Sequence, residues 1–304
     1  MHRQDVFPFF IGRARSGTTL LRAIFDGHPH LAIPPESHFI VPLRPRRRPF
    51  DVEMFLAQVQ AHPRYRLWAL DDRLVRDRLR QDDPATFEDG IRALFAAYAT
   101  HHGKPGYGDK TPAYVYRVPV LARMFPEARF VHIIRDGRNA SLSFLRTEFA
   151  SGGIEEAAFA WKVGTRRGRK AGARLGSERY FEVHYEALVD DPETETRKVA
   201  AFLGLTYDPA MLAYVERAET ILENTPHPAA HQNLRRAPTK TSTDWRREMP
   251  EADLETFELI AGDLLDELGY ERGNGRTQAA AGRKLRLQAR RVAKRTRKAL
   301  ARPA

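Results

Sequence analysis

The sequence of 304 residues contains no cysteine and no apolar run of membrane-spanning length. The first absence excludes a disulfide scaffold and thiolate metal sites, and it favours a reducing compartment. The second leaves no candidate for a spanning helix, which needs about 18 apolar residues. Residues 1–5 also lack the basic-then-apolar pattern of a signal peptide. Together these absences predict a soluble, cytoplasmic protein, long enough for one large α/β domain or two small ones.

Acidic residues are absent from the chain after Glu271. Twelve Lys or Arg residues follow between Arg272 and Arg302, whereas residues 1–271 hold 38 basic and 39 acidic residues, a net charge of −1. The net charge of +11 therefore belongs to the tail, and it does not indicate a specific nucleic-acid partner for the folded part. We expect a domain over 1–271 and a tail over 272–304. The tail is predicted to be disordered or a basic amphipathic helix. It could contact an acidic surface or membrane, although a tail that only adds solubility is the favoured interpretation.

The eleven histidines are scattered, and the adjacent pair His101-His102 lacks the i, i+4 helical spacing of metal ligands, so no metal is expected. A further absence lies within an anion loop. Residues 7–11 form an apolar run typical of a buried strand, and helical apolar spacing follows the loop. Gly12 and Gly17 have the spacing of the phosphate loop G-x-x-x-x-G-K-[ST], and Thr19 occupies its hydroxyl position, but Thr18 stands where the lysine belongs. Because that lysine serves the β- and γ-phosphates of a nucleoside triphosphate, the loop suits a shorter anion.

The run Arg15-Ser16-Gly17-Thr18-Thr19-Leu20 resembles the 5′-phosphosulfate loop of sulfotransferases that use 3′-phosphoadenosine 5′-phosphosulfate (PAPS). Residues 22–29 continue with R-A-x-x-D-x-H-P, a pattern similar to that of the tyrosylprotein sulfotransferases and their bacterial relatives. The resemblance implies that PAPS is the co-substrate. It also implies that Arg15, Ser16, Gly17, Thr18 and Thr19 hold the phosphosulfate.

A second nucleotide motif follows the best strand pattern in the chain, residues 128–134. Arg135 comes at its carboxyl end and Ser143 eight residues later, and a guanidinium fork and a hydroxyl can converge on one phosphate. This pair is similar to the family's 3′-phosphate motif. Residues 185–192 resemble the family segment Y-E-x-L-V-x-x-P, which implies that Tyr185 contacts the nucleotide. A half-buried core tyrosine is an equally good interpretation.

Two further residues are candidates for the chemistry. Glu36 follows two prolines that make its segment rigid, and a carboxylate there could act as a general base towards a hydroxyl, although most glutamates simply face solvent. Lys110 lies in a glycine- and proline-bounded turn at a strand end, where α/β sheets bind ligands. The resemblance implies that Glu36 is the catalytic base and that Lys110 neutralises leaving-group charge, with Arg15 also serving catalysis.

The remaining segments concern the acceptor and the closing loop. Residues 41–105 are predicted to be a helical insertion that could bind the acceptor, and residues 219–243 a long loop. In the family this loop closes over the nucleotide through a serine and a lysine before a tryptophan. Here Thr243 and Asp244 precede Trp245, and Lys240 or Arg246 could substitute for the lysine.

These patterns predict an α/β, P-loop-like fold with a mainly parallel sheet flanked by helices, in which strands 7–11 and 128–134 are central. The predicted function is transfer of the sulfuryl group of PAPS, by in-line displacement, to a hydroxyl of a glycan, lipid, tyrosine or small alcohol or phenol. Two alternatives stay open from the residues alone. One is a P-loop nucleotide kinase or NTPase with an atypical loop, and the other is a polyanion-binding protein that acts through its tail.

Overall fold

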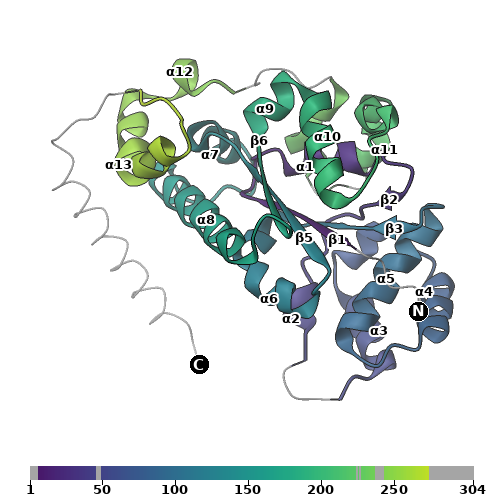
Figure 1. The fold of residues 1–304 in the computed structure, drawn as a ribbon. Helices are drawn as coiled ribbons and strands as arrows, with labels where there is room; N and C mark the ends of the chain where they lie inside the picture. The colour runs from purple at the N-terminus through teal and green to yellow at the C-terminus, as the bar shows by residue number, and fades with distance from the viewer. Residues whose placement is uncertain (1–5, 46–48, 224, 226, 237–242, 274–304) are drawn as a thin grey trace. The chain divides into compact units, whose positions relative to one another are not determined.

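The computed structural model describes residues 6–45, 49–223, 225, 227–236 and 243–273 (Figure 1). The chain divides into two compact units, Met1–Arg135 with Gly164–Ser242, and Asp136–Val163 with Thr243–Ala304. The predicted basic tail lies outside the described residues except for Arg272 and Gly273. None of the helices in the described part is both long and apolar enough to cross a membrane.

The first unit is built on a parallel four-stranded sheet with the order β4-β1-β5-β6. Its strands are β1 (Phe7–Gly12), β4 (Asp109–Lys110), β5 (Ala128–Ile134) and β6 (Tyr180–His184). All six residues of β1 are buried, as expected for an apolar strand covered on both faces. The predicted fold class is confirmed, with β1 and β5 at the centre of the sheet.

Alternate side chains of β1 enter two separate hydrophobic cores. Phe7, Phe9 and Ile11 pack with the helices of the insertion, whereas Phe10 packs with α1 (Thr18–Phe25) on the opposite face. This follows from the two-residue period of a strand, which sends successive side chains to opposite faces. The anion loop between β1 and α1 is therefore anchored from both sides of the sheet.

The insertion is helical, as predicted. Its elements are α2 (Ile40–Leu43), α3 (Val52–Ala61), the 3₁₀ helix η1 (Tyr65–Trp68), α4 (Asp72–Asp82) and α5 (Phe87–His101). A short strand after α1, β2 (Leu31–Ala32), pairs with β3 (Gly106–Tyr107) in a separate two-stranded sheet.

The other elements of the first unit include η2 (Pro112–Tyr116), α6 (Val118–Met124), α9 (Tyr185–Asp190), α10 (Pro192–Leu203) and η3 (Pro209–Arg217). The prediction of an uninterrupted loop over 219–243 is wrong, because α11 (Ala218–Glu223) and η4 (Pro228–Arg235) occur there. Ile221, Leu222 and Leu234 place apolar side chains in the same core as Phe10, and this burial stabilises the short helices.

The second unit contains α7 (Gly137–Leu145), α12 (Trp245–Glu248), α13 (Glu251–Glu267) and the first part of α8 (Ile154–Leu175), whose later residues belong to the first unit. Its core includes Trp161, Trp245 and Phe257. Gly137 is required at the start of α7, since a Cβ there would lie 2.3 Å from Trp161 Cδ2. The second unit thus has a hydrophobic core of its own.

Candidate active site

The carboxyl ends of the parallel strands bring the predicted residues of the first unit to one edge of the sheet. In the register of the sheet, Phe10 pairs with Lys110, Gly12 with Ile133, and Ile134 with His184. The segments that follow β1, β5 and β6 therefore leave the sheet at the same edge, where open α/β sheets bind ligands.

The anion loop turns through two left-handed residues, Arg15 with φ 68° and Gly17 with φ 97°. Gly17 is the N-cap of α1 and provides no side-chain acceptor for the first N–H groups of the helix. Ser16, Thr18 and Thr19 are buried beside these groups. A helix N-terminus with uncapped N–H groups and buried hydroxyls matches the chemistry of a phosphate or sulfate group.

Arg135 and Tyr185 lie directly against this loop. The Arg135 Nη1 donates to the carbonyl of Arg15 over 3.1 Å, and its guanidinium lies 4.5 Å from the Tyr185 ring centroid. A Cβ at Gly17 would lie 2.4 Å from Tyr185 Cδ2, so only glycine permits this approach. Burial, and after it the Arg135 guanidinium, lower the pKa of Arg15. The buried Arg135 and the half-buried Arg15 are neighbouring cations, which a multiply charged anion would stabilise.

Glu36 and Lys110 form an ion pair next to the loop. Lys110 Nζ donates to Glu36 Oε1 over 2.6 Å and lies 3.5 Å from Thr19 Oγ1, while His38 Nε2 lies 2.7 Å from Glu36 Oε2. Burial by itself would raise the pKa of Glu36, but the Lys110 charge and the His38 contact outweigh it and hold the pKa below its usual range. Burial lowers the pKa of Lys110, and Glu36 opposes this effect.

A buried polar cluster holds the Glu36 segment against β4. The backbone N–H of Ser37 donates to Thr111 Oγ1 over 3.1 Å, and Ser37 Oγ lies 3.0 Å from the Tyr114 hydroxyl. Thr111 Oγ1 also donates to Asp109 Oδ2 over 3.3 Å. Burial raises the pKa of Asp109 to about 6. These contacts determine where the Glu36 carboxylate meets Lys110.

His231 is a site residue that the sequence patterns did not single out. Its Nδ1 lies 3.3 Å from Arg15 Nη1, and the carbonyl of Ala230 accepts from Arg15 Nη2. Burial, followed by the charges of Arg15 and Lys110, lowers the pKa of His231 to about 3. The only sequence signal for His231 is its location in a segment expected to close over the site. Local spacing could not predict its contact with Arg15, because the two residues lie 216 positions apart.

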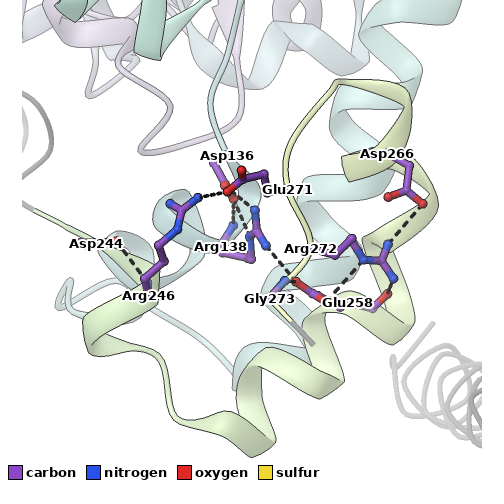
Figure 2. Close-up of polar contacts among 9 residues, drawn as sticks. All are labelled: Asp136, Arg138, Asp244, Arg246, Glu258, Asp266, Glu271, Arg272 and Gly273. Atoms are coloured by element: carbon purple, nitrogen blue, oxygen red, sulfur yellow. Dashed lines mark hydrogen bonds and ion pairs between the residues drawn. The ribbon is translucent and has the colours of Figure 1, made fainter. Parts of the chain in front are cut away.

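The predicted Ser143 lies on α7 in the second unit, whereas the other predicted residues lie in the first. In the same unit, an ionic network surrounds Arg138, which follows Arg135 by three residues (Figure 2). Arg138 donates to Asp136 Oδ2 over 2.7 Å and to Glu258 Oε1 over 2.8 Å. Arg138 is 1% exposed and Glu258 is 5% exposed. The network therefore joins the start of α7 to α13 within this unit.

The tryptophan of the closing-loop pattern belongs to the same unit. Trp245 is buried, its N–H group on the backbone donates to Asn139 Oδ1 over 2.8 Å, and the Arg138 guanidinium lies 3.7 Å from its ring centroid. Arg246 pairs with Glu271 over 2.6 Å, as Figure 2 shows. Lys240, the other candidate to replace the family lysine before Trp245, lies outside the described residues. Which of the two residues takes its place therefore stays a prediction. The described residues contain no group of three or more His, Asp or Glu able to hold a metal ion.

A parallel α/β sheet with a glycine anion loop at its carboxyl edge defines the protein as a P-loop-like α/β protein. A family model described as "Sulfotransferase family" matches residues 8–209, and the chain belongs to this family. It is therefore a sulfotransferase with PAPS as co-substrate. This assignment favours the sulfotransferase interpretation over the kinase or NTPase alternative that the loop alone had left open.

Similar proteins agree with the assignment. Protein-tyrosine sulfotransferase 1 of Danio rerio is 24% identical over 286 residues, covering 89% of this chain and 74% of that protein. Nodulation protein NoeE of Sinorhizobium fredii is 27% identical over 301 residues, covering 88% and 68%. In fold, the chain is similar to the sulfotransferase domain of the Synechococcus PCC 7002 olefin synthase, with a TM-score of 0.58 and 21% identity over 89% of this chain and 98% of that one.

Proposed function

We propose that the protein transfers the sulfuryl group of PAPS to an acceptor hydroxyl by in-line displacement, with Glu36 as general base and Lys110 beside the leaving group. The observation that carries this proposal is the 2.6 Å contact between Lys110 and Glu36, next to Thr19 of the anion loop. In the proposed reaction the base acts on the acceptor hydroxyl and the cation on the leaving oxygen, and positioning and electrostatics supply most of the rate.

The acceptor oxygen forms a bond to sulfur while the bond between sulfur and the bridging phosphate oxygen breaks. The hydroxyl proton passes to the Glu36 carboxylate, and the electron pair of the broken bond stays on the phosphate oxygen, where the Lys110 ammonium offsets its charge. The product nucleotide is 3′-phosphoadenosine 5′-phosphate (PAP).

The ion pair allows the pKa of Glu36 to change during the reaction. Lys110 and His38 hold the pKa of Glu36 low, and a carboxylate of low pKa accepts a proton poorly. If Lys110 turns towards the anionic co-substrate, Glu36 loses its main cation and its pKa rises. Binding of the sulfuryl donor would thus make the Glu36 carboxylate a stronger base before it accepts the proton of the acceptor hydroxyl.

The nucleotide contacts are also part of the proposal. Arg15, Ser16, Gly17, Thr18 and Thr19 would hold the 5′-phosphosulfate through the N–H groups and hydroxyls of the loop. Arg135 and Ser143 would hold the 3′-phosphate, and Tyr185 would contact the nucleotide. The contact between Arg135 and the Arg15 carbonyl supports this assignment for the residues of the first unit.

The acceptor class is proposed as a hydroxyl compound, and a tyrosyl hydroxyl is the first candidate to test, because similar proteins are protein-tyrosine sulfotransferases. Glycans, lipids and small alcohols or phenols are the other candidates. Residues 41–105 are proposed to bind the acceptor. A cytoplasmic location is proposed on the sequence features alone, and contact of the basic tail with an acidic surface or membrane stays a prediction.

The test separates binding from turnover. Arg135→Ala should weaken PAP binding at least tenfold by calorimetry, the loss expected for a charge-assisted contact. Glu36→Ala should bind PAP but lose ~10²-fold or more in the rate of ³⁵S transfer from labelled PAPS to the acceptor panel. Arg123→Ala, an exposed arginine on α6, is the matched control and should match the wild type. Unchanged PAP affinity in Arg135→Ala, or undiminished transfer in Glu36→Ala, would contradict the respective role.

A further inference from the structure

The η4 segment contacts the anion loop through one side chain and one carbonyl. Arg15 Nη1 lies 3.3 Å from His231 Nδ1, and Arg15 Nη2 donates to the carbonyl of Ala230. Both contacts are made to the arginine that the proposed function places on the phosphosulfate. The backbone of Arg15 is left-handed, so its side chain leaves the loop from an uncommon conformation and depends on such contacts for its direction.

The hydrogen-bonding chemistry determines the tautomer of His231. A guanidinium carries donors only and is charged at all ordinary pH values. The Nδ1 atom must therefore accept, which places the imidazole proton on Nε2. The charged and titratable groups that act on His231 are Arg15, Lys110, Glu36 and His227, and only Glu36 favours protonation of the ring. The neutral Nε2–H imidazole is thus the form present around neutral pH.

We propose that His231 is a positioning residue of the sulfuryl-transfer site, whose neutral imidazole orients the Arg15 guanidinium towards the 5′-phosphosulfate. This inference rests on the proposed function of Arg15. A guanidinium has five N–H groups in a planar fork, so contacts to η4 and to an anion are compatible in one side chain. When the Arg15 guanidinium is already oriented before the anion binds, binding no longer costs the conformational entropy of ordering this long side chain. A protonated ring could not serve, since it would repel Arg15 and offer no acceptor.

The alternative role for His231 is packing alone, as a buried residue that holds η4 in place. Two substitutions separate the roles. His231→Leu fills the place of the ring with an apolar side chain and removes the hydrogen-bond acceptor. His231→Asn keeps an acceptor near the position of Nδ1. Gln232→Leu is the matched control, because Gln232 is the exposed neighbour on the same segment and its contacts with Pro228 and Arg235 lie within η4.

The full-length variants are tested for PAP affinity by calorimetry, for KM of PAPS and kcat with labelled PAPS, and for thermal unfolding. We expect His231→Leu to bind PAP about tenfold more weakly, the value of a hydrogen bond to a charged group, and His231→Asn to recover most of this loss. Gln232→Leu should match the wild type. His231→Leu with wild-type affinity, or Leu and Asn variants equally impaired with equally lowered melting temperatures, would overturn the inference.

A measurement on the wild type reports the state of the ring directly, and it uses the His231→Asn variant only to assign the resonance. In ¹⁵N-histidine NMR, the resonance that His231→Asn removes should be that of an Nε2–H imidazole, and it should stay neutral down to about pH 5. An Nδ1–H tautomer or an imidazolium at pH 7 would overturn the inference. A wild type that binds no PAP would overturn the proposed function and this inference with it, whereas binding unaffected by His231→Leu would overturn this inference alone.

Discussion

Removal of the Glu36 carboxylate should destabilise the protein as well as slow it. In Glu36→Ala, Lys110 loses its 2.6 Å partner while its side chain remains only 1% exposed. Breaking a buried ion pair in this way usually costs about 3–5 kcal/mol, because the remaining charge is buried without compensation. This cost cannot exceed ~5 kcal/mol, because that free energy is enough to deprotonate a lysine with the ordinary pKa of 10.5 at pH 7, and a neutral lysine needs no charged partner.

The double variant Glu36→Ala/Lys110→Met tests the cause of this loss. It removes both charges, and an apolar side chain fills the place of the lysine, so most of the stability should return although activity does not. At roughly 2–4 °C for each kcal/mol, the single variant should melt about 6–20 °C below the wild type. The double variant should lie well above the single one.

Thermal unfolding by circular dichroism at pH 7, with PAP calorimetry beside it, measures both effects. Lys110→Met alone should be milder than Glu36→Ala, because the remaining Glu36 side chain is 20% exposed and keeps its contact with His38. A single Glu36→Ala variant within about 2 °C of the wild type would refute the reasoning. A double variant no more stable than Glu36→Ala would refute it as well, because the stranded charge would then not be the source of the loss.

Three further changes test other parts of the structure. Gly17→Ala should weaken PAP binding at least tenfold and cost about 1–3 kcal/mol, since it combines a φ of 97° with a 2.4 Å approach to Tyr185 Cδ2, and unchanged PAP affinity would contradict this. Asp109→Asn should raise the free energy of unfolding by up to ~3 kcal/mol at pH 7 but hardly at pH 4. The folded pKa of about 6 exceeds the ordinary 3.8, so the folded state binds more protons between these values and wild-type stability falls as pH rises through them. An equal effect at both pH values would show that ionisation is not responsible. Glu258→Leu should lower stability by roughly 1–3 kcal/mol in thermal unfolding, because the buried Arg138 guanidinium keeps Asp136 but loses its hydrogen bond to Glu258. Arg272→Leu, which removes a 20% exposed side chain from the same network, should cost less, and a reversed order would contradict the role of the network.

Local patterns determined much of the fold. The apolar run before Gly12 and the β-branched run before Arg135 predicted the two central strands, because a strand covered on both faces needs a continuous apolar sequence. The glycines and threonines of the loop predicted an anion site, since these residue types leave N–H groups and hydroxyls facing outward at a helix start. Each of these signals depends on residues within a few positions of one another, which is why the sequence by itself was sufficient.

The tertiary structure alone decided which side chains meet. Glu36 and Lys110 are 74 positions apart, and the sequence patterns offered a separate role for each without predicting their ion pair. Burial of the Asp109 carboxyl and the approach of His231 to Arg15 were likewise invisible in the sequence. The physical reason is that pKa values and hydrogen bonds depend on the neighbours that folding brings near, and no pattern of local spacing encodes those neighbours.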